Sequence, residues 1–385
     1  MSATVETLRT LAAFPTVSRD SNMALIDWAA ERLKPAGAAI RLFPSDDGRK
    51  ASLLATIGPD RDDGVILSGH SDVVPVEGQP WTSDPFELTE RDGGRLYARG
   101  SSDMKGFIAA MLTAADRARG RRLARPLHLA ISYDEEIGCV GIRPMLAALQ
   151  AEGFRASGCI IGEPTEMRVG TGHKGKVAGC ICCRGLEAHS SNPLLGLNAI
   201  HLGAGMVHEA ILLQERLAAA GARDGDYPVP HTTVHVGTIR GGTALNIVPG
   251  DCNVEFELRL VPPDDADALL AELARAGERL SAPGRARGLA TGIEVSTVNT
   301  YPGLDTDTGE AIVSLARMAT GQNGTVKLAF GTEAGLYQKR LGIPTVVCGP
   351  GSIDRAHKAD EYVTRDELAA CDAFLDRVVD KLAAG

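Results

Sequence analysis

Short apolar segments that alternate with helical segments constrain the fold of this chain more than any other feature of its sequence. In the first 170 residues we predict strands at 39–43, 52–57, 65–67, 126–133 and 159–161, and helices at 22–36, 105–119 and 141–150. Strands that alternate with helices predict an α/β domain built on a central, mostly parallel sheet.

The pattern changes in the middle of the chain. Between residues 175 and 298 the predicted order is strand, long helix, two strands, helix and strand. This βαββαβ order is typical of a small α+β sandwich. The α/β pattern then resumes. We therefore expect one discontinuous α/β domain of residues 1–174 and 299–385, interrupted by an inserted α+β domain of residues 175–298.

Charge and composition exclude several classes of partner. The chain has 385 residues, with 49 acidic and 40 basic side chains and a net charge of −9. We expect such a chain to bind neither nucleic acid nor a membrane surface. It contains no apolar run of the roughly 18 residues that a membrane span needs. Its start has no signal-peptide pattern, so we expect a cytoplasmic protein with reduced cysteines.

Three of the eight cysteines lie close together in the sequence. Cys180, Cys182 and Cys183 could form a soft-metal cluster, or they could belong to a strand of the inserted domain. The segment is apolar and reads as a strand, in which Cys180 and Cys182 would share one face and Cys183 would point the other way. We favour this structural interpretation.

Histidine and carboxylate side chains follow the ends of several predicted strands. In an open α/β sheet, ligands bind beyond the carboxyl ends of the strands, so we expect these side chains to converge. Two imidazoles and several carboxylates suit zinc, and they suffice for two ions if one carboxylate bridges. These residues are His70, Asp72, Asp103, Glu135, Glu136, Glu163 and His357.

The spacing of these residues indicates separate tasks. His70 and Asp72 are two residues apart on an extended chain, so Asp72 could orient the His70 ring. Glu135 and Glu136 are adjacent and point in different directions. One of them can bind metal while the other handles a water that the metal makes acidic. Each motif alone is commonplace, and their joint position at strand ends is what indicates a site.

The segments that carry these residues resemble the di-zinc peptidase and deacylase family. This family includes acetylornithine deacetylase, succinyl-diaminopimelate desuccinylase, aminoacylase and carboxypeptidase G. The resemblance extends from about residue 65 to residue 365 and is strongest to the acetylornithine deacetylase branch. It rests on LSGHSDVVPVEG, YARGSSDMKG, SYDEEIGCVG, IIGEPTEMRVGTGHKG and GPGSIDRAHKADEYV.

The resemblance implies a role for each of these residues. His70, Asp103 and Glu163 would bind one zinc ion, and Asp103, Glu136 and His357 would bind the second. Cobalt or manganese could substitute for zinc. Glu135 would be the general base, and Asp72 would orient His70. The family also has a cis peptide bond after the bridging aspartate, here between Asp103 and Met104.

The resemblance further implies that the inserted domain is a lid that forms a homodimer. His189 would cross the dimer interface and donate to the oxyanion in the partner's active site. Asn246 and Arg259 would hold the substrate carboxylate. The alternatives are a satisfied turn histidine for His189 and a surface salt bridge for Arg259. Glu333 is a candidate for binding a substrate ammonium group, or equally for a place behind the site.

These roles describe a metallo-amidohydrolase that acts on a small N-acyl amino acid. The branch resemblance implies hydrolysis of N2-acetyl-L-ornithine to L-ornithine and acetate in arginine biosynthesis. The alternatives are another acyl amino acid, such as acetylcitrulline or succinyl-diaminopimelate, or a dipeptide. A non-catalytic member of the family is the remaining alternative, although every catalytic position is filled.

Overall fold

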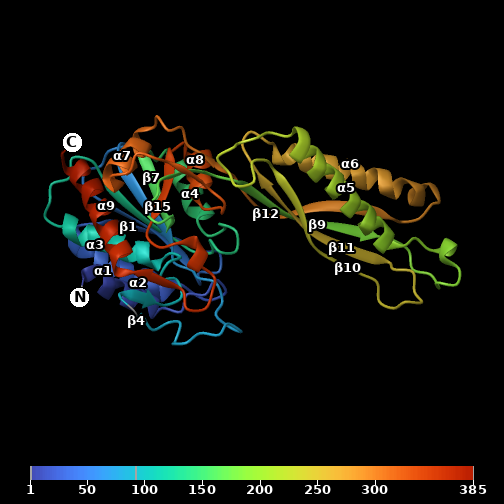
Figure 1. Cartoon of the computed structure of the whole chain (residues 1–385), viewed down its shortest axis with the longest axis horizontal. Coiled ribbons are helices and arrows are strands. Elements are labelled where there is room, and N and C mark those ends of the chain that lie inside the picture. The colour runs from blue at the N-terminus through green and yellow to red at the C-terminus, as the bar shows by residue number, and fades with distance from the viewer. Residues whose placement is uncertain (1, 92, 385) are drawn as a thin grey trace. The chain divides into compact units, whose positions relative to one another are not determined.

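The computed structural model describes residues 2–91 and 93–384, which form two compact units (Figure 1). Unit 1 comprises Met1–His173, Leu304–Leu328 and Thr332–Gly385, and unit 2 comprises Lys174–Gly303 and Ala329–Gly331. The expected boundary at 298/299 therefore differs from the structure. The last strand of unit 2 continues to Tyr301, and its hydrogen bonds keep this segment with unit 2.

Unit 1 contains a nine-stranded sheet in the order β1-β2-β6-β3-β7-β15-β8-β13, with β14 paired to β8. The four strands β6, β3, β7 and β15 are parallel neighbours at its centre. The predicted α/β class with a mostly parallel central sheet is confirmed. The strands are β1 (Ala39–Pro44), β2 (Ala51–Ile57), β3 (Val65–His70), β6 (Leu127–Ser132), β7 (Gly158–Pro164), β8 (Gly170–His173), β13 (Leu304–Asp305), β14 (Val326–Leu328) and β15 (Thr345–Gly349).

Helices cover both faces of this sheet. A Cβ at Gly69 of β3 would meet Met104 and Ile108, whereas the neighbouring Ser68 accepts a hydrogen bond from the Tyr337 hydroxyl at 3.0 Å. Successive strand residues face opposite sides, so α3 and α8 lie on opposite faces. The helices are α1 (Ala3–Ala12), α2 (Met23–Leu33), α3 (Lys105–Ala118), α4 (Arg143–Ala151), α7 (Ala311–Thr320), α8 (Ala334–Leu341) and α9 (Arg365–Ala384).

The central parallel strands end at one edge of the sheet. His70 at the end of β3 is in register with Ser132 at the end of β6, and Pro164 of β7 is in register with Gly349 of β15. The loops that follow these strands therefore begin side by side. Gly162 in β7 allows a close approach here, because a Cβ at this position would lie 1.9 Å from Cγ of Phe107.

A small three-stranded sheet, which the sequence did not predict, joins two distant parts of unit 1. Its strands are β4 (Thr89–Arg91), β5 (Arg95–Tyr97) and β16 (Tyr362–Thr364). The backbone N–H of Ala98 also donates to the carbonyl of Glu361 at 3.1 Å. This pairing fixes the segment before Asp103 against the segment after His357. Strands of three residues are too short to show a periodic pattern in the sequence.

Unit 2 is a four-stranded antiparallel sheet in the order β10-β11-β9-β12, with the predicted βαββαβ chain order. Helices α5 and α6 lie together over one face (Figure 1). Side chains such as Ile181, Cys183 and Val254 are buried on that face. The elements are β9 (Gly175–Arg184), α5 (Ala199–Ala220), β10 (Thr233–Gly241), β11 (Asp251–Leu260), α6 (Ala266–Ala286) and β12 (Gly292–Tyr301).

Among the described residues, none of the helices combines the length and the apolar character that a membrane crossing requires.

A buried histidine on β6 makes the stability of unit 1 depend on pH. Burial lowers the pKa of His128 to about 4, and its Nδ1 lies 2.9 Å from the hydroxyl of Thr56. A histidine in an unfolded chain titrates near pH 6.5. Between about pH 6.5 and pH 4 the unfolded chain therefore binds more protons than the folded chain. The free energy of unfolding falls as the pH drops through this window, by about 3 kcal/mol in total.

We predict that His128→Asn reduces this loss, because asparagine keeps a polar partner for Thr56 and does not titrate. The measurement is urea unfolding of the chelator-treated protein at several pH values between 7 and 4. The exposed His201 on α5 supplies the control variant His201→Asn, which should follow the wild type. An unchanged pH dependence in His128→Asn would show that the buried imidazole is not responsible.

Candidate metal centre

Asp103 lies between the two histidines that the sequence placed at strand ends. Its Oδ1 is 3.1 Å from Nε2 of His70, and its Oδ2 is 3.2 Å from Nε2 of His357. The two oxygens of one carboxylate therefore face two different imidazoles. This is the arrangement that a carboxylate bridging two cations requires.

A glutamate accompanies each histidine. Oε1 of Glu163 lies 3.7 Å from Nε2 of His70, and Oε2 of Glu136 lies 3.0 Å from Nε2 of His357. The structure thus brings together the two ligand sets that the resemblance implied. His70, Asp103 and Glu163 are buried, whereas the side chain of His357 is 51% exposed.

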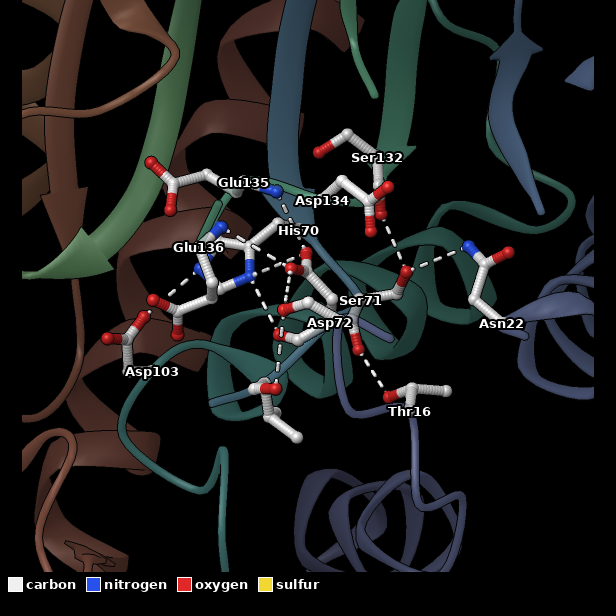
Figure 2. A network of polar contacts seen from close by, with 12 residues as sticks. Thr16, Asn22, His70, Ser71, Asp72, Asp103, Ser132, Asp134, Glu135 and Glu136 are labelled. Atoms are coloured by element: carbon white, nitrogen blue, oxygen red, sulfur yellow. Dashed lines mark hydrogen bonds and ion pairs between the residues drawn. The ribbon is translucent and has the colours of Figure 1, made fainter. Parts of the chain in front are cut away.

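Asp72 organises the surroundings of His70 (Figure 2). Nδ1 of His70 lies 2.9 Å from the backbone oxygen of Asp72 and 3.5 Å from its carboxylate. With a proton on Nδ1 shared with that oxygen, Nε2 keeps its lone pair for a cation. The Asp72 carboxylate also accepts from the backbone N–H groups of Glu135 at 3.1 Å and Glu136 at 3.3 Å. Asp72 therefore positions the His70 ring mainly through its backbone oxygen, and the backbone of both glutamates through its carboxylate.

The three consecutive acids after β6 have separate environments. Asp134 turns aside and forms an ion pair with Lys50 at 2.6 Å. Its φ of 54° lies in the left-handed region, which is uncommon for a residue with a Cβ. His357 has a similar φ of 61°. Such conformations persist where surrounding contacts fix them, and they cluster at functional sites.

The crowded carboxylates make this a site that favours cations. Burial raises the pKa of Glu135 to about 8 and that of Glu136 to about 7, and neighbouring negative charges add to both shifts. Burial also raises the pKa of Glu163 well above its ordinary value. Divalent cations would relieve this repulsion. The mixed imidazole and carboxylate donors fit zinc and related first-row ions.

The distances leave two roles open for Glu135. Among the described residues, three ligand atoms lie within 4.8 Å of one another in two groups: His70, Asp103 and Glu136, and His70, Glu135 and Glu163. The second group includes the residue expected to be the general base. The metal content of a Glu135 variant therefore has to show whether this residue is a base or a metal ligand.

A buried ion pair that the sequence pattern does not predict holds the backbone at Asp103 in place. Arg99 Nη1 lies 2.7 Å from Oε2 of Glu361, and both side chains are 1% exposed. Oε1 of Glu361 accepts from the backbone N–H groups of Ser102 at 2.9 Å and Asp103 at 3.0 Å. The Asp103–Met104 peptide bond is cis, as the resemblance implied. Nothing in the sequence pattern links residues 99 and 361.

Glu333 lies behind the centre, in contact with Ser132. The Ser132 hydroxyl donates to Oε2 of Glu333 at 2.9 Å, and the glutamate is 1% exposed. Burial raises the pKa of Glu333 to about 8, and the charge of Glu135 contributes. Oε1 has no hydrogen-bond partner among the described residues. The structure therefore places Glu333 close to the general-base candidate.

In unit 2, His189 and Asn246 lie side by side. The backbone N–H of Ser191 donates to Nδ1 of His189 at 3.1 Å, so the ring proton is on Nε2. His189 pairs with Ile247 in a β-bridge, and the N–H of Ser190 donates to the carbonyl of Asn246 at 3.0 Å. His189 and Asn246 are both exposed. His189 thus presents a donor nitrogen to the surroundings of unit 2.

Arg259 lies at the other end of strand β11. Its Nε is 3.1 Å from Oε1 of Glu257, and it lines a cavity of about 310 Å³ together with Lys174. The loop that carries Asn246 precedes Asp251, and the eight residue-to-residue steps along β11 from Asp251 to Arg259 span roughly 26 Å. Within one chain, Asn246 and Arg259 therefore lie toward opposite ends of β11.

Known proteins resemble this chain over nearly its whole length. The sequence profile of the peptidase family M20/M25/M40 matches residues 66–381. An acetylornithine deacetylase from Myxococcus xanthus is 37% identical over 98% of this chain and 97% of its own length. The acetylornithine deacetylase from Proteus mirabilis (strain HI4320) is 34% identical over 93% of this chain and 91% of its own length.

Solved structures share the fold at lower identity. A metallo-carboxypeptidase of the M20 family from Sulfolobus solfataricus has a TM-score of 0.78 and 20% identity, covering 100% of both chains. A dinuclear metal-binding peptidase of the same family from Bacillus subtilis has a TM-score of 0.69 and 17% identity, covering 98% of this chain and 97% of its own. The chain belongs to the peptidase family M20/M25/M40.

Proposed function

We propose that this enzyme hydrolyses the amide bond of N2-acetyl-L-ornithine to give L-ornithine and acetate, a step of arginine biosynthesis. The observation that carries the proposal is the bridging geometry of Asp103, with a histidine and a glutamate on each side and Glu135 nearby. The relatives named acetylornithine deacetylase support this substrate. The free cysteines suit a reducing compartment, which favours the cytoplasm.

We propose two zinc ions as the cofactor, with cobalt or manganese as substitutes. His70, Asp103 and Glu163 would hold one ion, and Asp103, Glu136 and His357 the other. Bound there, the ions would polarise the substrate carbonyl and make an active-site water more acidic. Asp72 would keep the His70 ring in the orientation that binding requires.

Glu135 is the proposed general base. It would take a proton from the attacking water and deliver it to the nitrogen of the departing amine. Its partly buried position and its raised pKa suit a group that must both accept and release a proton near neutral pH. The hydrogen bond from its own backbone N–H to Asp72 fixes where its side chain begins.

We propose that two copies of unit 2 form a homodimer and that each active site uses His189 of the partner subunit. The Nε2–H of His189 would donate to the oxyanion that develops on the carbonyl oxygen. Large apolar side chains are exposed on and around the two segments that carry His189 and Asn246, which suits a protein interface. They are Leu186, Leu194, Leu195, Leu245 and Ile247.

The substrate carboxylate is the proposed partner of Arg259, whose guanidinium can donate two parallel hydrogen bonds. The roughly 26 Å strand between Arg259 and the loop of Asn246 means that one chain cannot apply both to one carboxylate. In the proposed dimer, Arg259 and Asn246 at one site would come from different subunits. Glu333, with one unpartnered oxygen, remains the proposed partner of the ornithine ammonium group.

The first prediction from the proposed function concerns Glu135→Gln, which preserves size and removes the base. We expect kcat to fall by roughly 10²–10⁴-fold, with the metal content unchanged. The measurements are steady-state kinetics and elemental analysis of the same preparation. Asp134→Asn is the matched control, because this acid pairs with Lys50. Metal that is lost in proportion to activity would show that Glu135 is a ligand.

The second prediction concerns action across the dimer. Chains carrying His189→Ala and chains carrying Glu135→Gln should each be nearly inactive. Mixed under conditions of subunit exchange, they should regain activity, because one of the two sites in a hybrid dimer has both residues intact. Differently tagged subunits allow the hybrid to be isolated and counted. An inactive hybrid would mean that His189 serves its own chain or has no catalytic part.

The third prediction separates carboxylate recognition from ammonium recognition. Arg259→Lys should lower kcat/KM for every N-acetyl amino acid, since all share the carboxylate. Glu333→Gln should lower it for acetylornithine and leave acetylmethionine and acetylcitrulline nearly unaffected. The control for the first change is Arg240→Lys on the neighbouring strand. Equal losses for all substrates in Glu333→Gln would assign this residue a structural role beside Glu135.

The same panel of substrates tests the proposed function with the unaltered enzyme. The expected result is a higher kcat/KM for acetylornithine than for acetylcitrulline, succinyl-diaminopimelate, acetylmethionine or a dipeptide. A preference for a neutral side chain would replace the proposed substrate and retain deacylase chemistry. Fully metal-loaded protein that hydrolyses none of these compounds would favour the non-catalytic alternative.

A further inference from the structure

Two thiols lie together on the face of the unit 2 sheet that the helices leave uncovered. Sγ of Cys180 and Sγ of Cys182 are 3.5 Å apart, and both residues are partly exposed. Cys183 points to the opposite face and is buried under the helices. The segment is thus a strand, with Cys180 and Cys182 on one face and Cys183 on the other, as the sequence pattern predicts. Packing explains Cys183, but it gives no reason for a half-exposed pair of thiols.

Carboxylates flank this pair on both neighbouring strands. Glu255 of β11 is directly opposite Cys180, and Glu294 of β12 is directly opposite Cys182. Directly opposite residues in antiparallel strands share a face, with Cβ atoms about 4.5–5.5 Å apart. The register therefore places two sulfur and two carboxylate donors on one patch of three adjacent strands.

We propose that this patch is a metal site of unit 2, separate from the centre in unit 1, that takes a borderline-soft divalent cation of the zinc class. Its ligands would be Cys180, Cys182, Glu255 and Glu294. A tetrahedral ion with Zn–S bonds of about 2.3 Å places two sulfurs about 3.8 Å apart. The observed 3.5 Å is close to this edge, so the thiols need little movement to bind.

A disulfide between the same residues requires a larger change. Its sulfurs must approach to about 2.0 Å, and residues two apart on a strand have Cα atoms about 6.6 Å apart, near the upper limit for disulfides. The strand geometry therefore favours chelation of an ion over oxidation. Burial raises the pKa of Cys180 to about 11, so an incoming cation must displace the thiol protons.

The oxygen donors have room to take part. The Glu294 carboxylate makes no hydrogen bond or ion pair with the described residues, and it lines an open groove of about 430 Å³ with Cys182. Glu255 accepts from the Thr238 hydroxyl at 2.7 Å through Oε2, and its Oε1 lies 3.9 Å from Nη1 of the exposed Arg240, so a bound cation would replace this guanidinium as the partner of Oε1. Among the described residues, sets of three ligand atoms within 4.8 Å occur only in unit 1. Binding therefore requires rotation of the glutamates toward the sulfurs.

Cadmium or cobalt provides a direct test on the intact, metal-loaded enzyme. Thiolate ligation produces a sulfur-to-metal charge-transfer absorption, which the histidine and carboxylate ligands of unit 1 cannot give. We expect a band that saturates at one ion per chain. The double variant Cys180→Ser/Cys182→Ser should lack the band and retain the hydrolytic activity. Glu294→Gln should weaken binding by about 10-fold or more, and Glu272→Gln on α6 should leave it unchanged.

A second measurement uses only the unaltered chain, so the outcome does not depend on the variants folding. Zinc should protect Cys180 and Cys182 from alkylation, as read by mass spectrometry of the peptide that contains them. An absent band, or a band that persists in the double variant, would overturn the proposal. So would isolation of the pair as a disulfide after zinc loading under air, because the thiols would then oxidise in preference to binding the ion.

Discussion

The ion pair between Arg99 and Glu361 is the contact on which the metal centre most depends. Glu361 uses one oxygen for the guanidinium and the other for the backbone N–H of Ser102 and Asp103. Both charged groups are removed from water, so loss of either would leave the other uncompensated, at a cost of about 3–5 kcal/mol. The position of the Asp103 carboxylate therefore depends on an ion pair whose disruption would itself destabilise the folded protein.

The Arg99–Glu361 ion pair is also connected to His357 through hydrogen bonds. Arg99 also hydrogen-bonds to the side chain of Gln79, whose Nε2 donates to the backbone oxygen of His357 at 2.9 Å. The small sheet of β4, β5 and β16 holds Glu361 in place for both interactions. His357, which is half-exposed and has a left-handed backbone, thus gains its position from a buried group. The exposed His357 of the metal centre is therefore held in place by the buried Arg99, through Gln79.

The helices and strands that show a periodic pattern, and the site residues that follow the strand ends, could be predicted from the sequence. Parallel strands must finish at one edge, so the sequence alone predicts that His70, Glu135 and Glu163 meet. Arg99 and Glu361 could not be paired in this way, because their meeting depends on strands of three residues. The buried place of Glu333 beside Ser132 was equally hidden, since it depends on how α8 packs against the sheet.

The length of β11 sets a limit that no residue pattern revealed. A strand is nearly inextensible, so its roughly 26 Å between Asp251 and Arg259 cannot shorten to bring the two ends together. Residues that the resemblance assigned to one carboxylate therefore lie at opposite ends of a rigid element. Either one of them does not bind the substrate, or two chains contribute to each site. Because the sheet is rigid, the roles of Asn246 and Arg259 in binding the substrate depend on whether the chain forms a dimer.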